Sequence, residues 1–321
     1  MAFPVQSGPD MSTRTDSRTT PAAPGDGIVS HAAGMAAGSG AYVLFGLLAL
    51  YWPLLEPAGA LEILAHRIVW SLLFVVALLA VTSGRKAFKT LRGNRKALYY
   101  LVAAGCLVGA NWGFYIWAVN NNHVVEAALG YYINPLFSTL LGTLLLRERL
   151  HRAQWAAIAI AGSGVLWLAI AAGSPPWIAL ALAGTFGCYG LAKKQANLPA
   201  MESLAVETAT LVLPAAAFLV FLSAQGTGHF GADTGHSLLL ASSGLATAVP
   251  LLLFGFAATR IPLTAVGMLQ FLTPTIQFLI GVFGMHETVG EAGLGPYVLV
   301  WIAVAMYVVC DVRIRRRAAA G

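Results

Sequence analysis

Charged residues are scarce in this sequence. Of its 321 residues only 10% are Asp, Glu, Lys or Arg, whereas 58% are hydrophobic. An ordinary soluble domain carries roughly a quarter charged residues. The composition therefore excludes an ordinary soluble globular domain and indicates a membrane protein.

Cysteine and the motifs of enzyme sites are also scarce. The three cysteines lack metal-ligand spacing and lie in apolar stretches, where they are typical packing residues. We find no HExxH, no paired acidic DxxD, no nucleophile elbow and no Walker sequence. The sequence therefore predicts no catalytic residue, no metal site and no cofactor. A membrane-embedded enzyme acting on a lipid-linked substrate stays as the alternative function, and the short loops disfavour a scaffold or receptor.

Large apolar residues are few in residues 1–35, which include the stretch MSTRTDSRTTPAAPGDG. Such a segment buries too little apolar surface to offset the entropy of ordering. It also lacks the apolar core and cleavage site of a secretory signal. We expect a disordered tail.

From residue 36 onward, apolar stretches long enough to cross about 30 Å of hydrocarbon as helices follow one another. Alternating polarity, typical of membrane β-barrel strands, is absent, so the fold class is an all-α membrane protein. The predicted spans are 36–55, 67–83, 97–119, 124–146, 153–171, 175–193, 203–223, 237–258, 262–285 and 294–312.

The basic residues predict the orientation of these ten helices, because Lys and Arg in short loops stay on the cytoplasmic side. With both termini inside, 18 of the 19 Lys and Arg residues fall on the cytoplasmic side, and only Arg67 lies outside. The net charge of +6 is thus a topology signal, and no nucleic-acid partner is expected. The expected location is the bacterial cytoplasmic membrane, with lipid around the helices.

A broken hydrophobic segment occurs twice in the chain. YYINPLFSTLLGTLLLRERL at 131 and QFLTPTIQFLIGVFGMHETV at 270 share their spacing, and Pro135 and Pro274 lie 139 positions apart. The same offset relates Gly142 to Gly281 and Glu148 to Glu287. The sequence therefore predicts two repeats of five helices, at 36–172 and 173–312, followed by a basic cytoplasmic tail at 313–321.

An odd number of helices in each repeat inverts the second copy relative to the first. Inverted repeats with broken helices are typical of secondary transporters, in which two halves exchange conformations around a site near the midplane. Proline removes a helical hydrogen bond, so we expect Pro135 and Pro274 to kink helices four and nine. An ordinary structural kink remains open for either proline taken alone.

Several stretches resemble a known family. LEILAHRIVWSLLF at 61, NWGFYIWAVNNNHVVEAALGYYINPL at 111, PWIALALAGTFGCYGLAKK at 176 and IPLTAVGMLQFLTPTIQFLIGV at 261 are similar to RarD-type permeases of the EamA family, within the drug/metabolite transporter superfamily. The resemblance covers residues 36 to 312. It implies a ten-helix transporter of the inner membrane with two EamA repeats, moving a small organic solute by alternating access.

The ionisable residues inside the spans are the first candidates for a solute site, because charge is costly in lipid. We expect Arg67 and Glu126 to share a depth near the outer mouth and to pair there, with Arg67 holding the carboxylate or an anionic group of the solute. Separate snorkelling of both into the headgroups is the alternative. Glu62 and Glu207 are expected to be exposed to water or interface.

Uncharged polar and aromatic residues complete the predicted substrate-binding set. These are Asn111, Trp112, Tyr115, Tyr131, Asn134, Gln270 and Gln277. They are suited to a polar, aromatic cavity for a small-molecule solute. Interhelical hydrogen bonding by Asn and aromatic packing are the alternative for the residues of helices three and four. The sequence leaves open the natural solute, import or export, proton coupling and whether the chain forms a homodimer.

Overall fold

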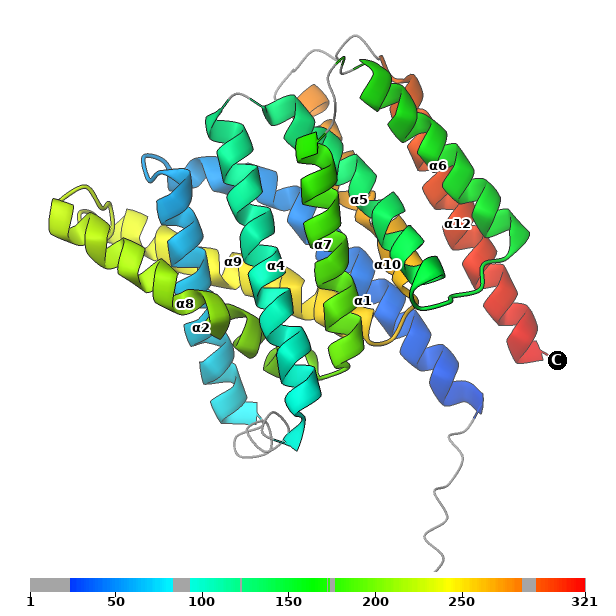
Figure 1. Ribbon diagram of the computed structural model, residues 1–321, viewed down its shortest axis with the longest axis horizontal. Helices are drawn as coiled ribbons and strands as arrows, with labels where there is room; N and C mark the ends of the chain where they lie inside the picture. Colours follow the sequence, from blue (N-terminus) through cyan, green and yellow to red (C-terminus); the bar gives the residue numbers. More distant parts are fainter. Residues whose placement is uncertain are drawn as a thin grey trace, which may run out of the picture.

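The computed structural model describes residues 24–82, 93–121, 123–171, 173, 177–284 and 293–320. Regular structure in this part of the chain is helical (Figure 1). The helices are α1 (Pro24–Tyr51), η1 (Trp52–Leu55), α2 (Ala60–Thr82), α4 (Arg95–Asn120), α5 (Val124–Leu144), α6 (Arg152–Ala171), α7 (Trp177–Ala196), α8 (Ala200–Gln225), α9 (Thr234–Ala258), α10 (Leu263–Gln270), α11 (Leu272–Leu279), the π-helical turn η2 (Ile280–Gly284) and α12 (Gly295–Ala320).

Eight helical segments are long and apolar enough, by length and composition, to cross a membrane. They come from α1, α2, α4, α6, α8, α9, the run from α10 to η2, and α12. The long helices α5 and α7 fall outside this set. In α7 the residues Lys193 and Lys194 lower the hydropathy of the last turn. The chain is therefore a multi-pass membrane protein.

Helices from the two halves of the chain interleave. In the core, α4 packs against α7 and α8, and α9 packs against α1 and α2. Helix α5 lies between α7 and α10, and α6 pairs with α12 at one side of the molecule (Figure 1). The closest approach of α5 and α10 requires a glycine, since a Cβ atom on Gly267 would lie 2.7 Å from the carbonyl oxygen of Pro135.

The start of α1 and the end of α12 lie side by side (Figure 1). His31 Nε2 on α1 and Asp311 Oδ2 on α12 are 3.6 Å apart. We name this end of the molecule the terminal face and the other end the opposite face. Helices α2 and α5 run from the opposite face toward the terminal face, and α10 starts at the terminal face.

The first two helices begin earlier than the sequence predicted. Helix α1 starts at Pro24, within the segment expected to be a disordered tail. Proline is favoured in the first helical turn, and the buried His31 and Gly34, which packs against Ile261, extend the packed helix below residue 36. Helix α2 starts at Ala60 rather than at residue 67, because its first turns bury polar side chains against partners.

The two prolines of the repeated segment lie in different backbone settings. Pro135 is inside α5, which is continuous from Val124 to Leu144. Pro274 lies three residues after Phe271, where the helix breaks between α10 and α11. Proline crowds the carbonyl four residues earlier and cannot donate to it. The break therefore leaves the Gln270 carbonyl without that helical partner.

Candidate functional site

Arg67 lies within α2 rather than at the start of the helix, where the sequence predicted it. Helix α2 begins seven residues earlier, which is about 10 Å along the helix axis. Its Nε donates to Thr247 Oγ1 on α9 at 2.9 Å. The guanidinium carbon lies 4.5 Å from the ring centre of Trp52 and 4.8 Å from that of Trp112. We call Trp52, Arg67, Trp112 and Thr247 the Arg67 cluster.

Three tyrosines surround this cluster. The side chains of Tyr51, Tyr115 and Tyr131 lie near the Arg67 guanidinium. The rings of Tyr115 and Tyr131 meet edge to face with centres 5.9 Å apart. Tyr51 Oη also bonds the carbonyl of Leu239 at 2.8 Å. The predicted residues Arg67, Trp112, Tyr115 and Tyr131 thus gather in the half of the molecule nearer the opposite face.

Asn111 makes different contacts from its neighbour Trp112. Its Nδ2 donates to the carbonyl of Leu182 at 2.9 Å and to Thr185 Oγ1 at 3.0 Å, both on α7. Adjacent residues of a helix point about 100° apart, so the side chain that ties α4 to α7 turns away from Arg67. This geometry is the interhelical hydrogen bonding that the sequence left open as an alternative.

The polar residues of α5 and α10 meet deeper in the molecule. Gln270 Nε2 donates to Ser138 Oγ at 3.2 Å. Asn134 lies one turn before Ser138 and is 5% exposed, yet its Oδ1 has no hydrogen-bond partner. Gln277 is half-buried on α11, beyond the helix break. Gln270 and Gln277 therefore lie on separate helical segments rather than along one straight helix.

Glu126 belongs to α5, but its side chain lies outside the described part of the structure. The predicted pair between Glu126 and Arg67 stays a prediction.

Glu207 is buried, contrary to the exposed interfacial position that the sequence predicted. Its side chain and that of Lys193 are both 2% exposed. Lys193 Nζ lies 2.7 Å from Glu207 Oε1, and Tyr189 and Ser203 donate to the same carboxylate at 3.0 and 2.6 Å. A complete set of donors makes this burial tolerable in the apolar interior. The sequence places Glu207 close to Lys193 and Lys194, but the burial of this pair was not predicted.

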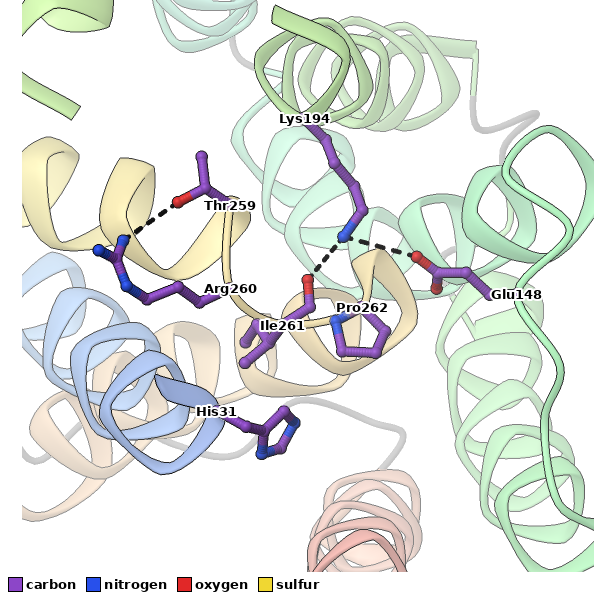
Figure 2. Close-up of a pocket in the computed structure, with 7 residues that line it drawn as sticks. All are labelled: His31, Glu148, Lys194, Thr259, Arg260, Ile261 and Pro262. Atoms are coloured by element: carbon purple, nitrogen blue, oxygen red, sulfur yellow. Dashed lines mark hydrogen bonds and ion pairs between the residues drawn. The ribbon is translucent and has the colours of Figure 1, made fainter. Parts of the chain in front are cut away.

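Glu148 closes the amino terminus of α10. Its two carboxylate oxygens accept from the backbone N–H groups of Leu263 at 2.7 Å and Thr264 at 2.9 Å. Lys194 Nζ lies 3.7 Å from Glu148 and donates to the carbonyl of Ile261 at 2.6 Å (Figure 2). An acidic side chain satisfies the free N–H groups and favours the positive end of the helix dipole. This contact joins the chain that follows α5 to α7 and α10.

Two pockets lie away from the Arg67 cluster. The first, of about 370 Å³, is at the terminal face and is lined by seven residues (Figure 2). They are His31, Glu148, Lys194, Thr259, Arg260, Ile261 and Pro262. The second, of about 290 Å³, lies between α2, α8 and the chain that follows α8, and it includes His66, Trp70 and Phe230.

Glu62 lines the second pocket and is buried, whereas the sequence predicted a water-exposed loop position. It is 4% exposed, and it accepts from His229 N at 2.7 Å and contacts His229 Nδ1 at 2.8 Å. The chain after α8 folds back over the first turn of α2 and supplies these partners. Hydropathy along the sequence contains no signal for this return.

The Arg67 cluster is equipped to hold an anion next to an aromatic group. A guanidinium offers five donors, and the described contacts use one of them, on Thr247. Aromatic faces stabilise the cation while leaving its edge for a carboxylate or phosphate. Within the described residues, no group of three or more His, Cys, Asp or Glu side chains could hold a metal ion.

Comparison with known proteins identifies the family of this chain. The EamA-like transporter family matches residues 32–170. "Protein RarD" of Streptomyces exfoliatus is 50% identical over 289 residues, which cover 89% of this chain and 91% of that protein. The chain belongs to the EamA-like transporter family.

Two further relatives include one whose name is that of a transporter. "Uncharacterized transporter YojE" of Bacillus subtilis is 42% identical, covering 86% of this chain and 93% of its own. "Protein RarD" of Escherichia coli is 38% identical, covering 86% and 94%. The resemblance to RarD-type permeases is confirmed, and the protein is a membrane transporter.

The EamA-family helix arrangement also occurs in a solved structure. A crystal structure of another protein superimposes with a TM-score of 0.69, covering 88% of this chain and 99% of that one. Sequence identity is 17%, so this likeness concerns the fold alone.

Proposed function

We propose that this protein is a secondary transporter that moves a small organic anion with an aromatic or apolar part across the bacterial cytoplasmic membrane by alternating access. The observation that carries the choice of solute is the setting of Arg67. Its guanidinium lies over the indole rings of Trp52 and Trp112 and donates one hydrogen bond to the Thr247 hydroxyl, inside an apolar helix bundle. A cation in such a place is a functional position by default.

The helix bounds support two inverted repeats. Shifting α4 by 139 positions gives 234–259, and α9 is Thr234–Ala258. The same shift of α5 gives 263–283, and the run from α10 to η2 covers Leu263–Gly284. We therefore count α5 and α7 as spans, which gives ten helices in two units of five.

The contacts between helices agree with a pair of inverted repeats, because equivalent helices of the two units make equivalent contacts. Helix α4 packs on α7, and its counterpart α9 packs on α1, the counterpart of α7. Likewise α2 packs on α9, and α8 packs on α4. Each unit thus contacts the other through equivalent helices, which is the arrangement that lets two units exchange conformations around a shared site.

The basic residues and the adjacent helix ends support the orientation. The start of α1 and the end of α12 share the terminal face. Lys194 and Arg260 lie at this same face, and we assign it to the cytoplasm by the positive-inside rule. Arg67 then lies in the outer half of the membrane.

Roles follow for the other predicted residues. Trp112, Tyr115 and Tyr131 would contact the aromatic or apolar part of the solute beside Arg67. Glu126 would compete with the solute for Arg67 and release it when the site is filled. Asn111 would tie α4 to α7. The part of α5, α10 and α11 around the break before Pro274 would move during transport, and it contains Asn134, Gln270 and Gln277. Pro135 would hold α5 close to α10, at the contact of its carbonyl with Gly267.

The decisive experiment measures uptake and efflux of labelled solutes by proteoliposomes containing the full chain. A panel of aromatic carboxylates is compared with the matched amides and amines, with and without a pH gradient. We expect saturable transport of the carboxylates and at least about tenfold weaker transport of the neutral and cationic analogues, since the Arg67 contact would be lost.

Two outcomes would overturn parts of the proposal. Equal transport of carboxylates, amides and amines would remove Arg67 as the determinant of the solute class. Rates no higher than in protein-free liposomes for the whole panel would remove the organic-anion transport function.

A further inference from the structure

The start of α10 is held at the terminal face by a set of polar contacts. Glu148 accepts from the N–H groups of Leu263 and Thr264, and Lys194 Nζ lies 3.7 Å from Glu148 Oε1. Lys194 also donates to the Ile261 carbonyl at 2.6 Å (Figure 2). We call these contacts the Glu148 latch. Both side chains line the first pocket, so the latch lies where that pocket meets the helix bundle.

The Glu148 latch joins the two predicted repeats. Glu148 follows α5 in the first repeat, whereas Lys194 on α7 and the whole of α10 belong to the second. Next to the latch the two helices are in close contact, because a Cβ atom on Gly142 would lie 3.0 Å from Thr264 Cγ2. Close packing and ionic contacts therefore close the terminal face between α5 and α10.

The helix that begins with α10 changes its partner beyond the break at Phe271. Helix α10 packs against α5, whereas α11 packs mainly against α1. Thr273 on α11 donates to the Tyr42 carbonyl on α1 at 2.8 Å. A Cβ atom on Gly46 of α1 would lie 2.7 Å from Ile276 Cβ on α11. The second half of this helix therefore lies against α1 and leaves α5.

This difference between the two ends indicates which side of the bundle is closed. Helix α5 and the run from α10 to η2 are equivalent helices, and the first is continuous while the second is broken. Inverted repeats reach the opposite state by exchanging such conformations. After the exchange α5 is the broken helix, at Pro135, and its second half moves away from α10. Glu148 follows that half of α5, so the Glu148 latch has to separate when the terminal face opens.

The charges of the latch are able to separate. The side chains of Glu148 and Lys194 are 14% and 24% exposed, so water can replace each partner when the contact breaks. The neighbouring pair of Lys193 and Glu207 differs, because both side chains are 2% exposed and separation would leave two buried charges. The terminal face therefore has a reversible ionic contact next to a permanent one.

We propose that Glu148 closes the cytoplasmic gate of the transporter. Its contacts hold the start of α10 against the end of α5 while the Arg67 cluster is reached from the outer side, and they break when the bundle opens to the cytoplasm. The gate rests on the proposed transport function and on the assignment of the terminal face to the cytoplasm.

The test measures opening of the gate through the labelling of one buried thiol. Cys106, Cys188 and Cys310 are first replaced by alanine in the full chain. Ser138→Cys then places a single thiol on α5 beside Gln270, where the native residue is 1% exposed. A membrane-impermeant maleimide is added to inside-out vesicles, in which it reaches the cytoplasmic side, and to right-side-out vesicles. The labelling rate is measured in both.

Two substitutions weaken the latch in this background. Glu148→Gln keeps the size of the side chain and removes its charge, and Lys194→Met removes the ammonium beside it. The matched control is Arg149→Gln, which removes a charge at the next, exposed position. A second reporter, Ser71→Cys, replaces a fully buried residue at the contact of α2 with α9 and detects a general loosening of the bundle.

The expected result is faster labelling of Ser138→Cys from the cytoplasmic side. Glu148→Gln should raise the rate in inside-out vesicles about threefold to tenfold, because a charged hydrogen bond that favours the closed state is lost. Lys194→Met should raise the rate less, since the α10 N–H groups keep their acceptors. Arg149→Gln should leave the rate unchanged, and Ser71→Cys should be labelled slowly in every variant.

Three results would overturn the gate. The first is an unchanged labelling rate of Ser138→Cys with Glu148→Gln. The second is an equal acceleration of both reporters, which means a general loss of stability. The third is an acceleration in right-side-out vesicles alone, which places the latch on the outer side.

The labelling needs no solute, so it is independent of the transport assay. Unchanged labelling together with intact transport of the carboxylates removes the gate alone. A solute panel without transport removes the organic-anion function and leaves the labelling result valid.

Discussion

Lys193 and Arg67 are both basic residues inside apolar helices, and their surroundings differ. Lys193 is enclosed: Glu207 lies 2.7 Å away, and the carboxylate takes further bonds from Tyr189 and Ser203. Arg67 has one described hydrogen bond, to Thr247, and two aromatic faces. A charge whose partners are complete stabilises the fold, and a charge with unused donors remains available to a ligand. The two regions should therefore respond differently to substitution.

Removing the carboxylate beside Lys193 is expected to have the largest effect on stability. Glu207→Gln leaves a buried ammonium without its counter-charge and should lower the free energy of unfolding by about 3–5 kcal/mol. Unfolding in mixed micelles measures the change. The matched double substitution Lys193→Met with Glu207→Gln removes both charges and should recover much of the loss. A decrease below about 1 kcal/mol for Glu207→Gln would mean that the pair is solvated.

Arg67→Lys should affect solute binding rather than stability. Lysine keeps the charge but loses the planar group that stacks on Trp52 and Trp112 and that binds a carboxylate through two donors. Affinity for the transported carboxylate should fall about tenfold to a hundredfold, with little change in unfolding. Arg260→Lys is the matched control, since Arg260 also lies over an aromatic ring, 3.4 Å from the centre of Phe256, but at the surface. Equal effects of the two substitutions would contradict a special role for Arg67.

Much of the fold could be predicted from the sequence because hydropathy changes sharply where the helices end. The predicted span 124–146 compares with α5 at Val124–Leu144, and 237–258 compares with α9 at Thr234–Ala258. The start of α2 was wrong because Glu62 and His66 looked too polar for a buried turn. Their burial depends on partners distant in sequence, such as His229, which no local pattern reveals.

The candidate site was also predictable only in part, because some of its residues stand out from their local sequence and others depend on distant partners. A lone Arg in an apolar stretch indicates a candidate functional position, so the sequence could single out Arg67 and Trp112, which the structure places side by side. Glu207 could not be distinguished from an interfacial residue, since its burial depends on the rotation of α8 toward Lys193 and Tyr189. The unpaired oxygen of Asn134 is visible only once α5 is packed in the bundle.

Glu148 lies between the two extremes, because its charge is partly exposed but its oxygens have fixed partners. Glu148→Ala removes the acceptors of the Leu263 and Thr264 N–H groups and should lower the free energy of unfolding by about 1–2 kcal/mol. Hydrogen exchange of these two amides should accelerate more than that of distant helices. Arg149→Ala, at the next exposed position, is the control and should leave both amides unchanged. Unchanged exchange in Glu148→Ala would mean that another group closes α10.

The contact of Glu62 with His229 should give the smallest change. The Glu62 side chain is 5% exposed but that of His229 is 36% exposed, so water can replace the imidazole. His229→Ala also leaves the backbone N–H of this residue bonded to Glu62 at 2.7 Å. We expect a loss of about 0.5–1 kcal/mol in the free energy of unfolding. A loss above about 2 kcal/mol would contradict this expectation. It would mean that the Glu62 carboxylate is shielded from water as completely as that of Glu207, because only such a carboxylate depends so strongly on one partner.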